Sequence, residues 1–133
     1  ILPSEVNLLR TAVKWKEIEE SAPEKALENT AYTVCAKRDG QIVGMARVLY
    51  DYCAIAYITD VIVLPEFQGN GIGREMTQRL VDYVFEYAPH NTDVYIYLCA
   101  SKGKESFYKK LGFVERPVGA LGAGMTKRVK KKG

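Results

Sequence analysis

The feature that most constrains the fold is an apolar strand followed at once by a glycine-rich loop. Residues 54–64, AIAYITDVIVL, form an almost continuous apolar run, which is typical of a central strand covered on both faces. Residues 64–73, LPEFQGNGIG, then place glycine at every second position from 69 to 73. Two interpretations are open at this point: loose glycine in a turn, or a loop built to hold an anion.

An amphipathic helix follows the loop. Apolar side chains recur every four residues, at Ile72, Met76, Leu80, Val84 and Ala88, with Val81 and Phe85 widening the stripe. This period predicts a helix packed on a sheet and ending near Pro89.

The rest of the chain predicts a mixed α/β sheet. Two N-terminal helices are expected, the first capped by Ser4 and the second, over 22–29, by a capping box of Ser21 and Glu24. Asp39-Gly40 separates YTVCAKR (32–38) from QIVGMARVLY (41–50), which predicts a hairpin.

After the amphipathic helix we expect four more elements. They are a strand at 93–100, a short helix at 104–111 ended by Gly112, and a final strand pair at 113–117 and 124–129.

Composition narrows the class of protein. The 133 residues suit a single domain, and no apolar run approaches the ~20 residues that a bilayer requires. No signal peptide is recognisable, so we expect a cytoplasmic protein, and the chain begins at Ile1 rather than Met. Three scattered cysteines, Cys35, Cys53 and Cys99, are expected as reduced core thiols, and with a single histidine no metal site is expected.

The basic tail contributes much of the net charge of +3. A solvated terminus is the simpler interpretation, because a nucleic-acid surface needs basic residues interleaved with aromatic ones on one face. Nucleic acid is therefore not the expected partner.

The position of the glycine loop favours an anion site. The first N–H groups of a helix lack intrahelical acceptors, and the helix dipole adds positive charge there. Arg74 is unfavourable for that dipole alone, which indicates a negative group nearby. The loop lacks Gly-Lys-Ser/Thr, and its G-x-G-x-G spacing differs from G-x-G-x-x-G, so nucleoside triphosphates and NAD are disfavoured.

The loop instead resembles the acetyl-coenzyme A loop of the GNAT superfamily of N-acetyltransferases, whose pattern is Gln/Arg-x-x-Gly-x-Gly/Ala after a strand and a proline. The matching residues here are Gln68, Gly69, Asn70, Gly71, Ile72 and Gly73. A second block, FYKKLGF at 107–113, is similar to the family's Phe-Tyr-x-x-x-Gly-Phe. Together the blocks cover roughly residues 30–128.

The resemblance implies a fold and a domain plan. The fold is a mixed, mostly antiparallel sheet with a splayed central strand pair and helices on both faces. The plan is one domain over 1–133, with acceptor-side helices at 1–29, an acetyl-CoA-binding core at 30–128 and a basic tail at 129–133. The family's first strand is missing or lies outside the sequence.

The resemblance also implies the residues that bind acetyl-CoA as cosubstrate. Backbone groups of Val61, Ile62 and Val63 would pair with the pantetheine arm, although plain core strand is the simpler role for their side chains. Backbone N–H groups from Gly69 through Arg74 would hold the pyrophosphate, with Gln68 bracing the loop. Ser101 replaces the family's asparagine and is expected either to contact the cofactor or to cap the next helix.

The implied reaction is direct attack of a neutral amine on the thioester in a ternary complex. Tyr108 matches the family's usual acid and would protonate the leaving thiolate; the alternative is an ordinary core or surface tyrosine. Asp60 is the only acidic residue of the central strand. Strict alternation puts it on the opposite face of the strand from Tyr57, Thr59 and Val61. Related enzymes, however, have a bulge in this strand, and their base often lies at positions matching Tyr57 or Thr59. A base, an amine-binding group and a structural ion pair remain open for Asp60, as does deprotonation through water.

The acceptor is not specified by the sequence. Trp15 and the acidic residues of 17–20 on the N-terminal side are candidates, although a solvated helix end is the simpler interpretation for the acids. Aromatic residues in or beside the strands are further candidates, namely Tyr50, Tyr52, Tyr57, Tyr95 and Tyr97. The acceptor is expected to be a small-molecule or peptide amine, and a homodimer is an expectation from the family. The alternative function is a catalytically idle acyl-CoA-binding sensor or interaction module.

Overall fold

A four-stranded mixed sheet organises the first of the two units into which the chain divides. The computed structural model describes residues 1–19 and 21–133, and the units are Ile1–Cys99 and Ala100–Gly133. Each unit is described by itself.

The sheet has the strand order β1-β2-β3-β4. Its strands are β1 (Tyr32–Arg38), β2 (Gln41–Tyr50), β3 (Ile55–Val63) and β4 (Tyr95–Tyr97). The first three strands are antiparallel neighbours, and β4 runs parallel to β3. The predicted hairpin is confirmed: Asp39 and Gly40 have φ of 51° and 79°, as a two-residue turn between twisted strands requires.

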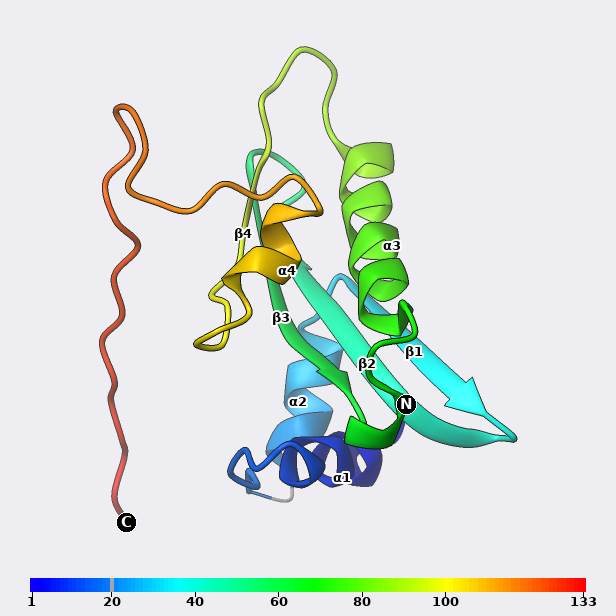
Figure 1. Ribbon diagram of the computed structural model, residues 1–133. Helices are drawn as coiled ribbons and strands as arrows, with labels where there is room; N and C mark the ends of the chain where they lie inside the picture. Colours follow the sequence, from blue (N-terminus) through cyan, green and yellow to red (C-terminus); the bar gives the residue numbers. More distant parts are fainter. Residues whose placement is uncertain (20) are drawn as a thin grey trace. The chain divides into compact units, whose positions relative to one another are not determined.

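The parallel pair β3 and β4 separates early. Pairing joins Ile55–Tyr57 to Tyr95–Tyr97, whereas β3 continues to Val63 (Figure 1). The predicted splayed central pair is therefore present. The strand predicted over 93–100 is shorter than expected, because β4 keeps its ladder with β3 for three residues only.

Helices cover both faces of the sheet, as the predicted fold class requires (Figure 1). Helix α3 (Ile72–Tyr87) packs on β1, β2 and β3 from one side, while α1 (Pro3–Ala12) packs on β2 and β3 and on α2 (Ala22–Glu28).

The buried stripe of α3 is narrower than the sequence predicted. Its buried residues are Met76, Thr77, Leu80 and Val84. Phe85 is 83% exposed, so its predicted place on the stripe is wrong. One residue after Val84 lies about 100° further round the helix, which carries Phe85 past the sheet.

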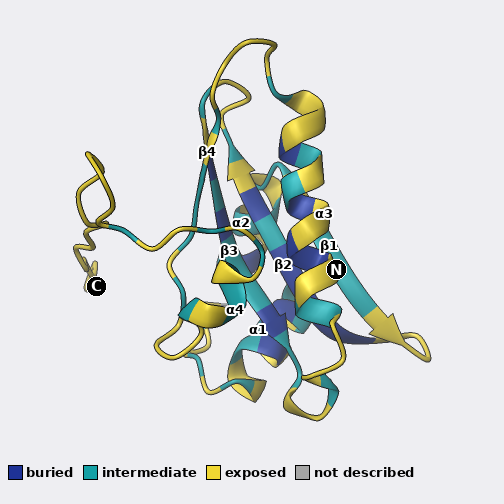
Figure 2. Ribbon diagram, turned by 45° about the horizontal axis from the view of Figure 1, so that its top comes forward, coloured by how far each residue is buried: buried dark blue, intermediate teal, exposed yellow. Residues whose placement is uncertain are grey.

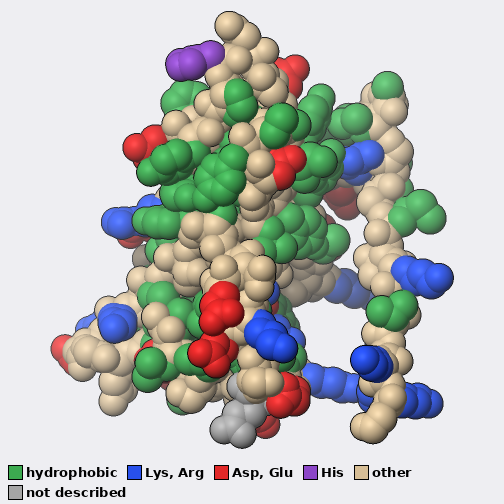
Figure 3. Space-filling view, turned by 180° about the vertical axis from the view of Figure 1, so that it is seen from behind, with side chains coloured by type: hydrophobic (Ala, Val, Ile, Leu, Met, Phe, Trp, Pro, Cys, Tyr) green, Lys and Arg blue, Asp and Glu red, His purple; other side chains and the backbone are tan. Residues whose placement is uncertain are grey.

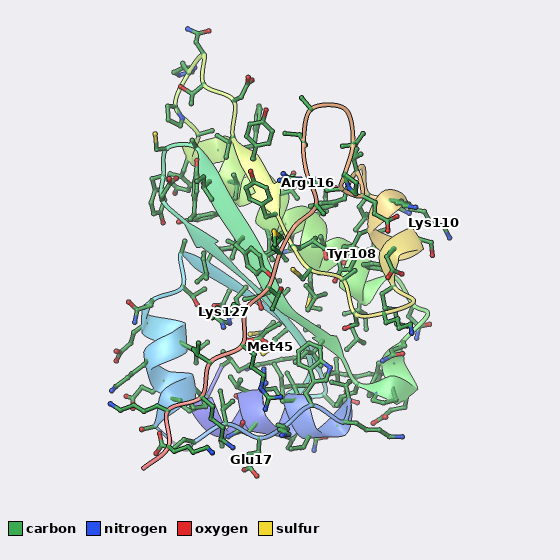
Figure 4. All side chains as sticks on the ribbon, turned by 90° about the vertical axis from the view of Figure 1, so that its left-hand side faces the viewer. Glu17, Met45, Tyr108, Lys110, Arg116 and Lys127 are labelled. Atoms are coloured by element: carbon green, nitrogen blue, oxygen red, sulfur yellow. The ribbon has the colours of Figure 1, made fainter. Side chains whose placement is uncertain are left out.

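A second apolar layer lies between the sheet and α1. Its buried cluster consists of Val6, Leu9, Ile42, Met45 and Ile62. Figure 2 shows the dark-blue buried positions concentrated in β2, β3 and the inner sides of the helices, and Figure 4 shows Met45 above α1. The sheet thus holds β3 between two packed layers.

The predicted Ser4 cap is wrong, and the predicted capping box of Ser21 and Glu24 does not form. Helix α1 begins at Pro3, a residue preorganised for the first helical position, and the Glu5 carboxylate accepts a hydrogen bond from the Leu2 N–H at 2.8 Å. Ser21 is the N-cap residue of α2, as predicted, but its hydroxyl donates to Glu19 Oε2 at 2.6 Å and makes no capping hydrogen bond to the helix.

The second unit contains one short helix, α4 (Glu105–Lys109), followed by Gly112 at φ 92°. The predicted strands at 113–117 and 124–129 are wrong, because the only β-type contact found in this unit as described is an isolated bridge between Val118 and Leu121. A two-stranded pair is marginal unless an apolar face is covered, and Met125 and Val129 are 95% and 83% exposed.

The three cysteines are free thiols. Cys35 is half-buried, whereas Cys53 and Cys99 are exposed, so the predicted core position is wrong for the last two. Across residues 1–19 and 21–133, no helix is long and apolar enough to cross a membrane.

Candidate functional site

The glycine loop connects β3 to α3 and takes its shape from backbone conformation. After a single 3₁₀ turn, Pro65–Phe67, Gly69 and Gly71 adopt φ of 83° and 81°. A Cβ atom added to either glycine would meet nothing within 4 Å. Glycine is therefore required here for its left-handed backbone, since open space surrounds both positions.

Side chains of the loop tie it to the end of β3. The Gln68 Nε2 donates to the Val63 carbonyl at 2.9 Å, and the Asn70 Nδ2 donates to the Phe67 carbonyl at 3.2 Å. Both amides are thus engaged in holding the loop, which leaves backbone N–H groups as its donors.

The N-terminus of α3 has no side-chain cap. Its N-cap is Gly71, whose carbonyl accepts the first helical bond from Glu75 N–H at 3.0 Å. The N–H groups of Ile72, Gly73 and Arg74 precede that bond and have no intrahelical acceptor. Arg74 is exposed and forms none of the ion pairs found among the described residues. Unpaired N–H groups, a helix dipole and a free cation fit a diphosphate group.

The strand before the loop has an open edge. Beyond Tyr57, the part of the chain that the structure describes within Ile1–Cys99 gives β3 no partner strand on the β4 side. Backbone groups of Val61–Val63 on that edge are available to an extended ligand, while the Ile62 side chain, 1% exposed, packs toward α1. Packing and backbone binding are compatible roles for this segment.

A β-bulge lies at Asp60, within this strand. Met45 pairs with Ile62 and Arg47 pairs with Thr59, so β3 has one residue more than β2 between these pairs. Asp60 itself has φ of 52°, in the left-handed region. The bulge therefore interrupts the strict alternation that would place Asp60 and Thr59 on opposite faces of the strand.

Two arginines bind the Asp60 carboxylate. Arg10 Nη1 lies 3.1 Å from Oδ1, and Arg47 Nε lies 2.8 Å from Oδ2. The Asp60 side chain is 9% exposed, and Arg47 also donates to Thr30 Oγ1 at 2.9 Å. Among the roles left open by the sequence, this geometry corresponds to the structural ion pair.

The partners of Asp60 were not identified from the sequence. Arg47 interrupts an otherwise apolar strand, which is a usable signal for a buried pair. Arg10 gives no comparable signal, because its contact with Asp60 spans 50 residues.

Tyr57 lies at the last position of β3 that pairs with β4. A hydrogen bond to the Cys99 side chain, together with partial burial, raises the pKa of Tyr57 to about 12. The phenol therefore stays neutral across the physiological range, suited to donating a hydrogen bond.

Tyr108 and Ser101 belong to the second unit. Tyr108 is half-buried in α4 and contacts Phe107 and Phe113 edge-on, with ring centroids 4.9 and 6.0 Å away. Burial raises the pKa of Tyr108. Figure 4 shows Tyr108 and the exposed Lys110 projecting from opposite sides of this short helix. The Ser101 carbonyl accepts from Lys104 N–H at 2.9 Å, and its side chain does not cap α4.

The structure therefore brings together only part of the predicted site. Asp60, Val61–Val63 and Gln68–Arg74 form one continuous stretch of the first unit. The placement of Tyr108 and Ser101 beside that stretch stays a prediction.

The candidate acceptor residues fall into separate groups. Trp15 lies under the Arg10 guanidinium at 5.4 Å, Tyr95 and Tyr97 stack at 6.2 Å, and Tyr50 and Tyr52 contact each other at 4.7 Å. Figure 3 shows several hydrophobic side chains gathered below the single histidine. Glu17 and Glu19 are exposed, and Glu20 lies outside the described residues.

A pocket that the sequence did not predict lies at the C-terminal half of α3. Its volume is about 390 Å³, and its lining residues are Tyr32, Arg79, Asp82, Tyr83, Glu86 and Tyr87. It opens at the end of α3 opposite the glycine loop.

A family sequence model and the curated relatives of this chain indicate the same family. A sequence model of the family described as acetyltransferase (GNAT) matches residues 5–113. The chain is 34% identical over 122 residues to an uncharacterized N-acetyltransferase of Pyropia yezoensis, covering 89% of the chain and 68% of that protein. It spans only 32–45% of the length of several other curated relatives.

Solved structures show the same fold. A probable acetyltransferase of unknown function from meticillin-resistant Staphylococcus aureus superposes with a TM-score of 0.84 at 25% identity, covering 96% of this chain and 92% of that one. A predicted acetyltransferase from Clostridium acetobutylicum, whose structure contains acetyl-CoA, has a TM-score of 0.66 at 24% identity, with 88% of each chain covered.

Proposed function

Since the chain belongs to the acetyltransferase (GNAT) family, we propose that it transfers an acetyl group from acetyl-CoA to a primary amine by direct attack in a ternary complex. The family uses acetyl-CoA and acts on small-molecule or peptide acceptors. We propose that the acceptor of this chain is an amine of one of these two classes.

One observation carries the donor side of the proposal. The loop Gln68–Gly71 leads from the open edge of β3 to the N-terminus of α3, which has no side-chain cap, and this supports a diphosphate site at the first N–H groups of the helix. Backbone N–H groups of Gly69 to Arg74 would hold the diphosphate, with Arg74 as its cation. The backbone of Val61, Ile62 and Val63 would pair with the pantetheine arm, and Ser101 would contact the cofactor from the second unit.

Acetyl-CoA, when bound, supplies an activated acetyl group as a thioester. The role proposed for Tyr108 is to donate its phenolic proton to the departing thiolate. The phenol is protonated at neutral pH, as this role requires, and burial, which raises the pKa of Tyr108, keeps it protonated to higher pH.

Removal of a proton from the acceptor ammonium is the least specified step. A carboxylate whose two oxygens both accept from guanidinium groups has little remaining capacity to act as a base. We therefore favour deprotonation through water over direct proton abstraction by Asp60.

The proposal is tested by mixing the protein with acetyl-CoA and a panel of amines and following thiol release. The expected result is amine-dependent release that falls strongly in Tyr108→Phe. Equal rates in the two proteins would remove Tyr108 from the acid role while leaving acetyl transfer intact.

A second candidate function is an acyl-CoA-binding module without turnover. The observation that favours it is the ion pairing of Asp60 with two arginines, which leaves the bulge without a free carboxylate. This module would be stabilised against heat by coenzyme A yet release no thiol with any amine.

Three further features are proposed with this function: a cytoplasmic location, a single domain over residues 1–133, and a homodimer. Size-exclusion chromatography with light scattering measures the last directly. A monomeric mass at micromolar concentration would contradict the dimer and leave the activity proposal unaffected.

A further inference from the structure

We infer that Asp60 is a positioning residue: its ion pairs with Arg10 and Arg47 hold the β-bulge that orients the backbone of Val61–Val63 on the open edge of β3. The link from this backbone to acetyl-CoA rests on the proposed function. The clamp, by which we mean the Asp60 carboxylate with the Arg10 and Arg47 guanidinium groups, rests on contacts within the first unit.

The backbone of Asp60 lies in the left-handed region. A non-glycine residue at φ of 52° is strained, and aspartate is among the few residue types that tolerate this region. Such a conformation persists only where surrounding contacts over-determine it. Here the contacts are the two guanidinium groups, which reach the carboxylate from α1 and from β2.

The second step concerns the direction of the strand. With the inserted residue, Ile62 pairs with Met45 and lies on the face of the sheet that packs against α1. On the other side of the bulge, Thr59 pairs with Arg47. Successive residues of a strand direct their N–H and C=O groups to opposite edges. The presence of the bulge therefore decides which of Val61, Ile62 and Val63 directs its N–H and C=O to the open edge.

The third step concerns the elements that the clamp joins. The Arg10 side chain also donates to the Lys16 carbonyl at 3.1 Å and lies over Trp15, while Arg47 donates to Thr30, two residues after the end of α2. Arg10, Asp60 and Arg47 are all largely buried, with side-chain exposures of 20%, 9% and 15%. One carboxylate thus connects the N-terminal helices to the strand proposed to bind the donor.

The test compares Asp60→Ala, Asp60→Gly and Arg10→Gln with the wild type. The readouts are amide hydrogen exchange at residues 61–63 in the free protein and calorimetric binding of coenzyme A. Asp60→Ala removes both the clamp and the tolerance of left-handed backbone, so we expect faster exchange and about tenfold weaker binding through lost preorganisation. Asp60→Gly keeps the backbone conformation accessible and should fall between Asp60→Ala and the wild type.

Two controls separate positioning from general loss of stability. Asp39→Ala removes another left-handed aspartate, in the exposed hairpin, and Val84→Ala opens a cavity at the far end of α3. Both should leave exchange at 61–63 and coenzyme A affinity unchanged. If Asp60→Ala does not fold, Arg10→Gln decides, because Arg10 is the more exposed partner.

The inference is overturned if folded Asp60→Ala matches the wild type in exchange at 61–63 and in coenzyme A affinity. If Asp60→Ala does not fold, the same result in Arg10→Gln overturns it. Should the wild type bind no coenzyme A, the proposed function fails while hydrogen exchange still decides the clamp. With an active amine, Asp60→Asn should lower kcat by up to about a hundredfold without changing the shape of the pH profile. Loss of an ionisation limb in that variant would instead identify Asp60 as the base.

Discussion

Tyr108 is the single residue on which the proposed proton donation depends. Its ring is packed edge-on between Phe107 and Phe113, and this burial raises the pKa of the phenol. A raised pKa means that the neutral form persists to pH values above the ordinary 10. The proposed acid is therefore protonated over the whole range in which such an enzyme is normally assayed.

Replacing Tyr108 with phenylalanine removes the proton donor and little volume. We expect kcat to fall by about 10²- to 10⁴-fold, the usual contribution of a positioned acid, with coenzyme A affinity nearly unchanged. Steady-state thiol release measures kcat. The matched control is Tyr87→Phe on the exposed side of α3, which should retain full activity.

Tyr83 gives a pH prediction that does not depend on catalysis. Its hydroxyl lies 2.7 Å from that of Tyr52, and this hydrogen bond, followed by burial, raises the pKa of Tyr83 to about 12. Stability from this raised pKa is fully present below pH 10 and is lost as pH rises from 10 to about 12.

Tyr52→Phe should therefore lower the pKa of Tyr83 toward 10. Ultraviolet titration of phenolate measures the change, and Tyr50→Phe, which leaves the Tyr52–Tyr83 hydrogen bond in place, is the control. An unaltered late titration step in Tyr52→Phe would show that this hydrogen bond does not set the pKa.

At the scale of elements, the strand–loop–helix unit combines a largely half-buried strand, two left-handed glycines and a helix without a side-chain cap at its N-terminus. Gly71→Ala should destabilise the fold by about 1 to 2 kcal/mol, the cost of left-handed backbone for a residue with a Cβ. Because Gly71 is the N-cap of α3, the same change should also weaken coenzyme A binding.

The matched control for Gly71 is Gly40 in the β1–β2 turn. Gly40 has φ of 79° and, like Gly71, open space around its missing side chain. Gly40→Ala should cost similar stability in urea unfolding while coenzyme A affinity stays unchanged. Equal losses of affinity in both variants would argue against a specific role for the loop.

Elements whose signals are local were predictable from the sequence. The hairpin at Asp39-Gly40 and the helix after the loop depend on short patterns, and both are present. The strands expected at 113–117 and 124–129 depend on a partner and a covered face, neither of which a local pattern specifies. The same limit explains Phe85, whose exposure depends on how much of the surface of α3 the sheet covers.

At the scale of the whole molecule, the site depends on contacts between distant residues. The glycine loop was predictable because its residues are contiguous. The clamp was not, since Arg10, Arg47 and Asp60 come from α1, β2 and β3 and meet only through tertiary packing. Sequence patterns thus located the glycine loop but left the role of the only acidic residue of β3 open.

The layer between the sheet and α1 should contribute heavily to global stability. Leu9 is fully buried there, so Leu9→Ala is expected to cost about 2 to 5 kcal/mol in urea unfolding. Phe85→Ala, on the exposed side of α3, should stay within about 0.5 kcal/mol of wild type. A small effect of Leu9→Ala would indicate that α1 is not packed as described.

The most direct test of the central claim is mass spectrometry of amines incubated with the protein and acetyl-CoA, with released thiol counted in parallel. We expect at least one acetylated amine, one thiol released for each acetyl group transferred, and strong loss of both signals in Tyr108→Phe. Tight coenzyme A binding with no acetylated product from any small-molecule or peptide amine would contradict it.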